Sequence, residues 1–278
     1  MVRHACSIVS LAVAYVFTSF VGYRGIAPIG SSEEVAEAAL ANPVGGISGR
    51  VVFEGEILDR RLVVQAGNPR VDGLCCSEEI FSNELVINPD DRGVMHAFVY
   101  LRSTVSPEQI PALLNKRPES PVNVEIEGCQ FWPHASIVRT GQPIEVTSLD
   151  PTPHTVRTLP ALNRAYIATI PYDFNSTEPM PVGSLMIEGY SKRERVPFEV
   201  QCNDHKWMAA YWLVVDHPYA AVTDFHGRFT ISGLPAGEHE FTVWHELTGF
   251  IHRKLRVKIS PGETTDVKEI SVAADRFR

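Results

Sequence analysis

Four residues with metal-binding side chains constrain most strongly how this chain can fold. Three of them, Cys202, His205 and Met208, lie in one short segment. The fourth, His154, lies far upstream in a Pro-His-Thr-Val sequence. A thiolate, two imidazoles and a thioether form the donor set of a trigonal copper site with a weak axial ligand. The pattern therefore predicts a sandwich of strands that brings the two segments together at one end.

Each of the four donors suits a copper ion that changes its oxidation state. The soft sulfur of Cys202 holds Cu(I), and the imidazoles of His154 and His205 suit both oxidation states. Met208 is predicted as the axial ligand, at a position that also accepts other groups. Taken singly, these residues are more typical of a buried thiol, surface or loop histidines and a core methionine. Their spacing favours the interpretation as metal ligands.

The N-terminal residues are typical of an export signal. Basic residues precede an apolar run from Ala5 to Gly22. A basic start and an apolar middle define a secretory signal peptide, but a run of this length can also stay as a membrane anchor; a buried core helix is the third alternative. We predict that residues 1–24 are a signal peptide or an anchor, with 5–22 as the tether in the second case, and that 25–45 are a linker. The predicted location is periplasmic or extracellular.

The composition excludes some classes of function. A chain of 278 residues with a formal net charge of -8 lacks the positive surface that phosphate binding needs, so no nucleic-acid partner is expected. Neither a Gly-x-Ser-x-Gly sequence nor a His-Glu-x-x-His sequence is present, and both are signatures of hydrolytic sites. The chain is therefore not expected to be an enzyme. Its length favours two domains after the leader.

Three further cysteines follow the leader, besides the predicted ligand Cys202. Cys75 and Cys76 are adjacent, and neighbouring cysteines rarely satisfy the geometry of a disulfide with each other. In an oxidising compartment, a disulfide from one of them to Cys129 is the favoured pairing. Three buried free thiols are the alternative.

The pattern from Gly45 onward predicts an all-β fold. Short runs of strand-forming residues alternate with glycine and proline, which is typical of sandwiches or barrels. A helix is predicted only from Ser106 to Lys116, with Pro107 near its start. The predicted strands cover residues 47–53, 97–101, 122–126, 144–148, 155–158, 185–188, 196–201, 209–215, 229–232, 239–245, 254–259 and 266–272.

Four motifs occur in a fixed order around the predicted ligands: Phe131-x-Pro133, Gly141 to Val146, Asp150-x-x-x-His154-x-Val156 and Cys202-x-x-His205-x-x-Met208. On these motifs, the segment from about Pro121 to Asp216 resembles a cupredoxin, the Greek-key sandwich that carries blue copper. Its loop, with two residues between histidine and methionine, is most similar to the amicyanin type.

The cupredoxin resemblance implies a type 1 copper site with His154, Cys202, His205 and Met208 as ligands. It also implies that electrons leave through the edge of His205, near which a redox protein partner docks. The charged residues beside His205 depart from the apolar docking patch of that family. Trp207 is open to three interpretations: a shield for the metal, part of a docking surface, or a packing residue.

A second resemblance lies outside this segment. The Thr223-Asp224-x-x-Gly227-x-Phe229 sequence, with Gly49-Arg50-Val51 and the run Ala97 to Leu101 upstream, resembles the carboxypeptidase regulatory-like domain, a transthyretin-type sandwich. Because the cupredoxin-like segment separates these pieces, we predict a domain insertion; sequential domains with an unrelated N-terminal β region are the alternative. The predicted domains are a split regulatory-like sandwich at 46–118 and 217–272 and a copper domain at 119–216.

The remaining histidines give weaker signals. Cys129 and His134 as a second metal pair are not favoured, because only two ligands are at hand. We interpret His217, His239, His245 and His252 as solvated or hydrogen-bonded, since no spacing unites them.

The leading hypothesis is thus an exported blue-copper protein that carries single electrons between redox partners through the Cu(II)/Cu(I) couple. The alternative is an extracellular β-sandwich binding or interaction module without redox activity. A copper chaperone or store is a third hypothesis, although the chain has no methionine-rich cluster.

Overall fold

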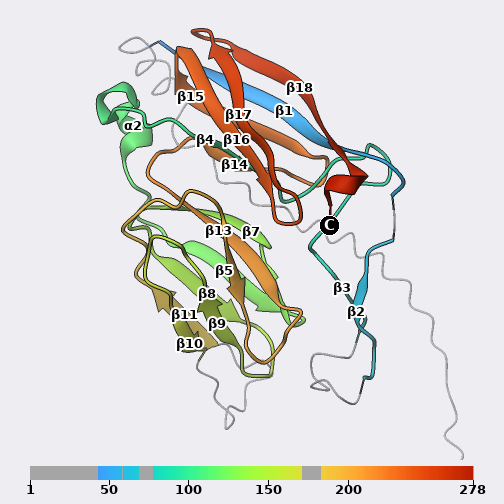
Figure 1. Ribbon diagram of the computed structural model, residues 1–278. Helices are drawn as coiled ribbons and strands as arrows, with labels where there is room; N and C mark the ends of the chain where they lie inside the picture. Colours follow the sequence, from blue (N-terminus) through green and yellow to red (C-terminus); the bar gives the residue numbers. More distant parts are fainter. Residues whose placement is uncertain (1–42, 58, 69–77, 171–182, 278) are drawn as a thin grey trace, which may run out of the picture.

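The computed structural model describes residues 43–57, 59–68, 78–170 and 183–277 (Figure 1). Within these ranges the chain is nearly all β, which confirms the predicted fold class. The predicted export or anchor helix lies outside the described residues. No helix in the described ranges is long and apolar enough to cross a membrane.

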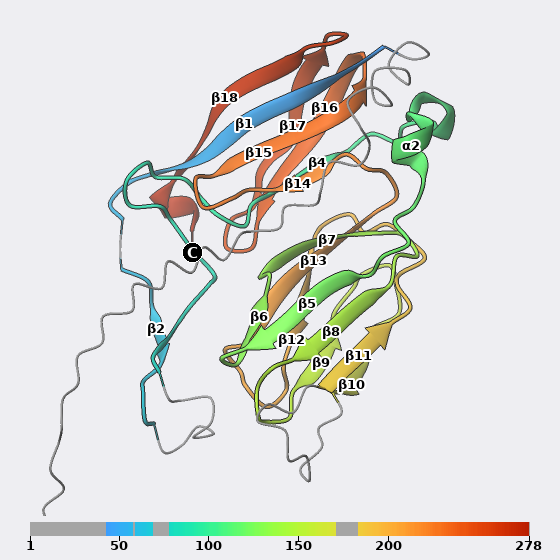
Figure 2. The same cartoon turned by 180° about the vertical axis from the view of Figure 1, so that it is seen from behind.

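The middle of the chain forms one sandwich, which we call the inner sandwich. One sheet has the order β11-β8-β5-β6 and the other has the order β10-β9-β12-β13-β7 (Figure 2). Its core holds alternate side chains of these strands, such as Ile144 and Val146 of β8. The strands are β5 (Val122–Glu127), β6 (Gln130–Trp132), β7 (Ala135–Arg139), β8 (Ile144–Ser148), β9 (Thr155–Thr158), β10 (Ile167–Thr169), β11 (Gly183–Ile187), β12 (Phe198–Gln201) and β13 (Ala209–Val215).

Strands from before and after this segment form two further sheets, the outer sandwich. Their orders are β15-β1-β18 and β14-β4-β16-β17. A separate apolar core lies between them, with Ile47, Val99 and Phe241 among its fully buried members. The strands are β1 (Val44–Glu54), β4 (Phe98–Leu101), β14 (Ala220–Val222), β15 (Arg228–Pro235), β16 (Gly237–His245), β17 (Gly249–Ile259) and β18 (Thr264–Ala273). The exact domain limits stay a prediction.

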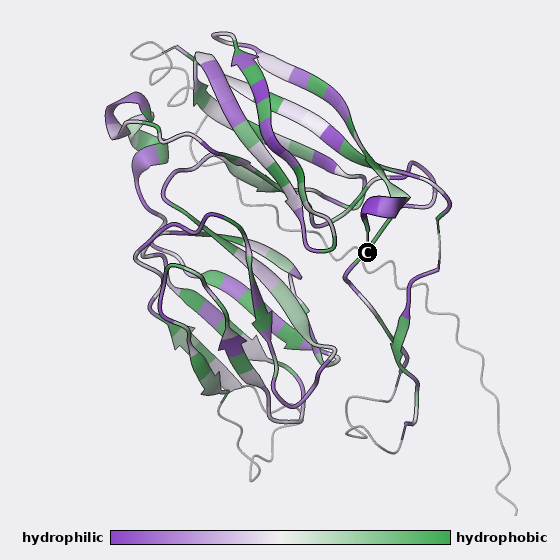
Figure 3. Ribbon diagram, in the orientation of Figure 1, coloured by the Kyte–Doolittle hydropathy of each residue, from purple (hydrophilic) through white to green (hydrophobic). Residues whose placement is uncertain are grey.

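The two sandwiches meet through a third apolar layer. Phe98, Tyr100 and Trp244 of the outer sandwich pack with Leu213 and Val215 of the inner one. Figure 3 shows the alternation of hydrophobic and hydrophilic residues along the strands. Because strands alternate their faces, a sheet packed on both sides is apolar on both. β13 has this character, with its last four residues buried.

One hairpin lies before the inner sandwich in the chain but packs against it. It consists of β2 (Leu62–Val64) and β3 (Ile80–Phe81). Although it precedes the inner sandwich in the chain, Val64 and Ile80 belong to the inner core. The amide of Asn83 also donates a hydrogen bond to Gln130 Oε1 at 2.8 Å.

The predicted helix from Ser106 to Lys116 is wrong in its length. A 3₁₀ turn (η1, Pro107–Gln109) and one α-helical turn (α2, Ala112–Asn115) occupy this region. Between them Ile110 adopts an extended conformation, as is usual for a residue that precedes a proline. Pro111 thus divides the segment, because it cannot donate a backbone hydrogen bond.

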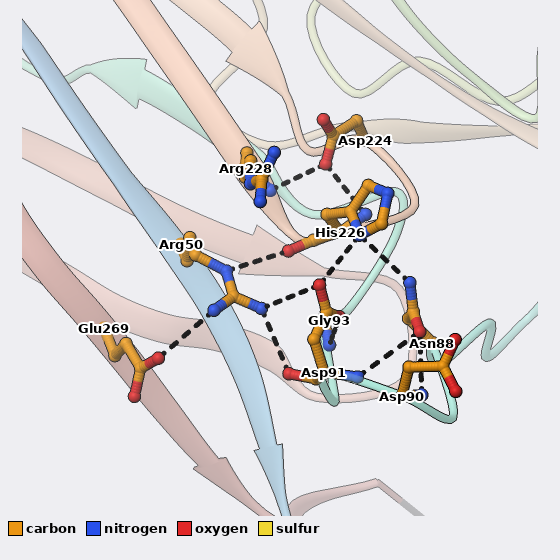
Figure 4. Close-up of polar contacts among 9 residues, drawn as sticks. All are labelled: Arg50, Asn88, Asp90, Asp91, Gly93, Asp224, His226, Arg228 and Glu269. Atoms are coloured by element: carbon orange, nitrogen blue, oxygen red, sulfur yellow. Dashed lines mark hydrogen bonds and ion pairs between the residues drawn. The ribbon is translucent and has the colours of Figure 1, made fainter.

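Two loops of the outer sandwich are fastened around Arg50 (Figure 4). The guanidinium donates to the carbonyl oxygens of His226 and Asp91, and it pairs with the carboxylates of Asp91 and Glu269. The ring of His226 in turn lies 2.7 Å from the Asp91 carboxylate. Asp224 accepts from the backbone N–H of His226. The Thr-Asp-x-x-Gly sequence therefore closes a turn against β1.

We expect substitution of Gly227 in this turn to destabilise the fold. Gly227 has a φ of +69°, and an added Cβ would lie 2.2 Å from the carbonyl oxygen of Val51. Gly262 has a similar φ of +73° and open space around it. Both alanine variants incur the left-handed penalty of about 1–2 kcal/mol, and Gly227→Ala adds the cost of overpacking, for a total of about 2–5 kcal/mol. Denaturant unfolding measures both losses; equal losses would contradict the close contact.

Candidate metal centre

The pairing of two strands brings the distant histidine to the loop. His154 immediately precedes β9, and Cys202 immediately follows β12. These strands are antiparallel neighbours, with Gln201 opposite Arg157. The start of one strand and the end of the other therefore lie at the same edge of the sheet. The convergence predicted from the sequence is present.

The distances between the donors fit a trigonal metal site. Cys202 Sγ lies 3.9 Å from His154 Nδ1 and 3.6 Å from His205 Nδ1. Metal bonds of about 2.3 Å to sulfur and about 2.0 Å to nitrogen, at an angle of about 120°, place sulfur and nitrogen about 3.7 Å apart. All three side chains are buried, at 5% exposure or less. The thiol of Cys202 thus lies at the distance expected of a fellow ligand from one nitrogen of each imidazole.

Met208 closes the loop that holds two of these donors. Its N–H donates to the carbonyl oxygen of His205 at 2.9 Å, and its carbonyl accepts from the N–H of Cys202 at 3.3 Å. The side chain is 2% exposed and packs in the inner core together with Cys202. Its role as axial ligand stays a prediction.

Asp150 orients the upstream histidine, a role that the sequence analysis did not assign. Its Oδ2 lies 2.9 Å from His154 Nε2 and accepts the N–H of Cys129 at 2.8 Å. Its Oδ1 accepts the N–H of Gly128 at 2.7 Å. In the neutral ring that binds a metal, a proton on Nε2 that is donated to this carboxylate leaves the Nδ1 lone pair directed toward Cys202. In the sequence, the position of Asp150 four residues before His154 was the signal that could have indicated this contact.

Hydrogen bonds favour the charged forms of the two central groups. Burial alone would raise the pKa of the Cys202 thiol, but His154, His205 and the Thr155 N–H lower it from 9.0 to about 5. Burial would likewise lower the pKa of His154, but Asp150 and Cys202 raise it from 6.5 to about 9. Without metal, the pair is therefore a thiolate and an imidazolium at neutral pH.

Cys129 lies beside the centre but does not offer a thiolate. It is disulfide-bonded; its predicted partners, Cys75 and Cys76, lie outside the described residues, so the pairing stays a prediction. Its sulfur and donor atoms of His154 and His205 lie within 4.8 Å of one another. A disulfide sulfur lacks the negative charge of a metal-binding thiolate. Cys202, the free cysteine of the described part of the chain, is therefore the better donor.

The surroundings of His205 differ from those that the family resemblance implies. His205 is 5% exposed as a whole residue, so little of its ring reaches solvent. Trp207 packs against it with 5.2 Å between ring centroids, and its indole N–H donates to the carbonyl oxygen of Cys129. Trp207 is half-buried, and it both shields His205 and fastens the loop. The flanking Asp204 and Lys206 are exposed.

The other histidines divide into two groups. The ring of His217 donates to the carbonyl oxygen of Leu101, and that of His239 donates to the carbonyl oxygen of Pro235. His252 is exposed. These three occupy the hydrogen-bonded or solvated positions that we expected. His134 and His245 are buried where the two sandwiches meet.

Comparisons with known proteins show similarity to copper proteins at a low level. No model of a known protein family matches the chain, and no curated protein matches it. Among solved structures, the chain is similar to a Cu-containing nitrite reductase (NirK) from Thermus scotoductus SA-01, with 16% identity and a TM-score of 0.27. The match covers 34% of this chain and 22% of the reductase.

Amicyanin structures are also found in this comparison. The reduced Cu(I) form at pH 4 of an amicyanin mutant is 12% identical, with a TM-score of 0.26, over 43% of this chain and 99% of amicyanin. An oxidised amicyanin mutant is 13% identical, with a TM-score of 0.26, over 38% and 96%. At these identities and scores the likeness carries no inference about function.

The charge state of the metal-free centre predicts a pH dependence. The folded pKa of Cys202 is depressed, so its contribution to the free energy of unfolding is full above pH 9 and is lost as the pH falls through about 5. The folded pKa of His154 is raised, so its contribution is full below pH 6.5 and is lost as the pH rises through about 9.

We therefore expect the thiolate absorbance of metal-free protein, taken as the difference from Cys202→Ser, to titrate with a midpoint near pH 5. Asp150→Asn should move this midpoint upward, because the imidazolium of His154 loses the carboxylate that stabilises it. A midpoint near 9 in the wild type would contradict the thiolate–imidazolium pair.

Proposed function

We propose that this chain is an exported type 1 copper protein that carries single electrons between redox partners. When bound, copper supplies the Cu(II)/Cu(I) couple. The observation that carries the proposal is the placement of Cys202 Sγ at 3.9 Å and 3.6 Å from the Nδ1 atoms of His154 and His205. One thiolate and two imidazoles in a trigonal plane are the donors of blue-copper sites.

The residues around the donors favour fast electron transfer. Asp150 holds the ring of His154, and Asp150 is itself held by two backbone N–H groups. Two backbone hydrogen bonds of Met208 close the loop between Cys202 and β13. Donors that are fixed in this way change position little when the metal changes charge, so little energy is spent on rearrangement.

The same surroundings supply the means of setting the redox potential. The Thr155 N–H donates to Cys202 Sγ at 3.5 Å, and a hydrogen bond to the thiolate withdraws electron density from the metal bond. Met208 as axial ligand and the apolar core around Cys202 act on the potential as well. Because binding requires the thiolate, metal affinity falls at low pH.

The partner and the location belong to this proposal too. A redox protein would dock near His205, over the half-buried Trp207 and between the exposed charges of Asp204 and Lys206. The burial of His205 means that the electron passes through its covering residues rather than through a bare ring edge. An export signal at residues 1–24, or an anchor through 5–22, would place the protein in the periplasm or outside the cell.

Colour is the direct test of this function. We expect the copper(II)-loaded protein to show the intense blue absorption of a copper–thiolate bond, which reduction bleaches reversibly. Cys202→Ser should lose the colour, because the hydroxyl cannot replace the thiolate. His252→Ala, which changes an exposed histidine, is the matched control and should stay blue.

Visible spectra, spin resonance and metal analysis of the purified protein distinguish the electron carrier from the two alternative functions. A wild-type protein that holds no copper would favour the binding module. A copper(II)-loaded wild type without colour would contradict the type 1 centre. A site that takes Cu(I) tightly but exchanges electrons poorly would favour the chaperone or store.

A further inference from the structure

A second group of histidines lies buried where the two sandwiches meet. His134 connects β6 and β7 of the inner sandwich, whereas His96 precedes β4 and His245 ends β16 of the outer one. Their exposures are 3%, 7% and 0%. Three imidazoles from three separate segments are thus excluded from solvent together, beside the apolar layer that joins the sandwiches.

The contacts of these rings leave nitrogen atoms without partners. The rings of His96 and His134 lie 4.9 Å apart between centroids. His134 Nε2 lies 2.5 Å from Glu246 Oε1, in a pair that is almost fully buried. Among the described residues, His134 Nδ1 and His245 Nε2 have no hydrogen-bond partner. The N–H of Leu247 donates to His245 Nδ1 at 3.4 Å, so the proton of the neutral ring lies on Nε2 and must move to Nδ1 before Nε2 can bind a metal.

Glu246 plays the same part at His134 that Asp150 plays at His154. A carboxylate that accepts the proton of one ring nitrogen fixes the tautomer and leaves the other nitrogen with its lone pair. Histidine ligands of metals usually have such a carboxylate behind them. His134 is therefore prepared to bind through Nδ1.

The backbone at His96 is also unusual. Its φ is +68°, a conformation that non-glycine residues adopt at a cost. Such residues persist where the surrounding structure requires them, and they are enriched at functional sites. Here the conformation places the ring of His96 against that of His134.

Burial keeps two of the rings, those of His96 and His245, uncharged. Burial lowers the pKa of His96 well below 6.5 and that of His245 to about 3. Both rings are therefore neutral at physiological pH, and the neutral imidazole is the form that binds metals.

We propose that His96, His134 and His245 bind a second metal ion, a divalent transition metal such as Cu²⁺, with Glu246 orienting His134. Three imidazoles form a set of nitrogen donors that suits copper and zinc. Among the described residues, the group of three metal-binding side chains whose donor atoms lie close together, within 4.8 Å of one another, is Cys129, His154 and His205, and the three rings of the proposed second site are not such a group. Binding at the second site therefore draws the rings together.

A cavity lies near this cluster, although His96, His134 and His245 are not among its lining residues. Its volume is about 280 Å³, and Leu247 and Phe277 form part of its lining, with Arg60 and Glu84 among its charged members. Phe277 contacts the ring of His245, with 5.4 Å between centroids. Leu247 follows Glu246 directly in the chain.

The test uses a full-length background that lacks the first centre, Cys202→Ser combined with His205→Ala. We expect this protein, after removal of metals, to bind one equivalent of Cu²⁺ with a spin-resonance signal of nitrogen ligation. His96→Asn keeps a residue that tolerates the left-handed backbone, and His245→Gln retains a polar side chain. Each should weaken Cu²⁺ binding at least tenfold, whereas His252→Ala should not change it.

Circular dichroism and unfolding of the metal-free variants show whether they fold, and either folded variant is sufficient for the comparison. A background protein that binds no Cu²⁺ would overturn the second site. Unchanged affinity in His96→Asn and His245→Gln, or loss of binding in His252→Ala, would overturn it as well. The proposed electron-carrier function is tested separately, by the colour of wild-type protein, so either proposal can fail alone.

Discussion

The pairing of β9 with β12 is the constraint on which the candidate metal centre depends. It places His154 at the start of one strand beside Cys202 at the end of its antiparallel neighbour. The fixed separation of neighbouring strands, rather than any direct attraction between the side chains, sets the distance between them. A slip of one residue in the register would turn His154 to the opposite face of the sheet.

Two carboxylate–histidine pairs in this structure have the same arrangement. Asp150 and Glu246 each lie behind a buried imidazole, and each contacts the Nε2 atom of that ring, so Nδ1 is the nitrogen that is left for a metal. Their surroundings differ. His154 faces a thiol that becomes a thiolate, so the first centre has charge to offer a metal. His134 lies beside the imidazole rings of His96 and His245, so a metal there would bind through nitrogen donors and would be held less tightly.

Local patterns predicted the first centre because its donors have fixed spacing and lie directly beside strands. Cys202, His205 and Met208 occupy one loop, and β8, β9 and β13 have the predicted bounds. The part played by Asp150 depends on a contact that spacing only suggests. The group of His96, His134 and His245 has no sequence pattern, because packing between two sandwiches creates it. The helix from Ser106 to Lys116 fails for a local reason, since Pro111 interrupts it.

The central claim is that one metal ion binds to Cys202, His154 and His205 together. An anomalous difference map from a crystal of copper-loaded protein, recorded at the copper edge, tests it most directly. The account predicts a peak about 2 Å from Cys202 Sγ and from both Nδ1 atoms, since metal bonds to these donors have that length. Copper that is bound elsewhere in the chain, with no peak among these three donors, would contradict it.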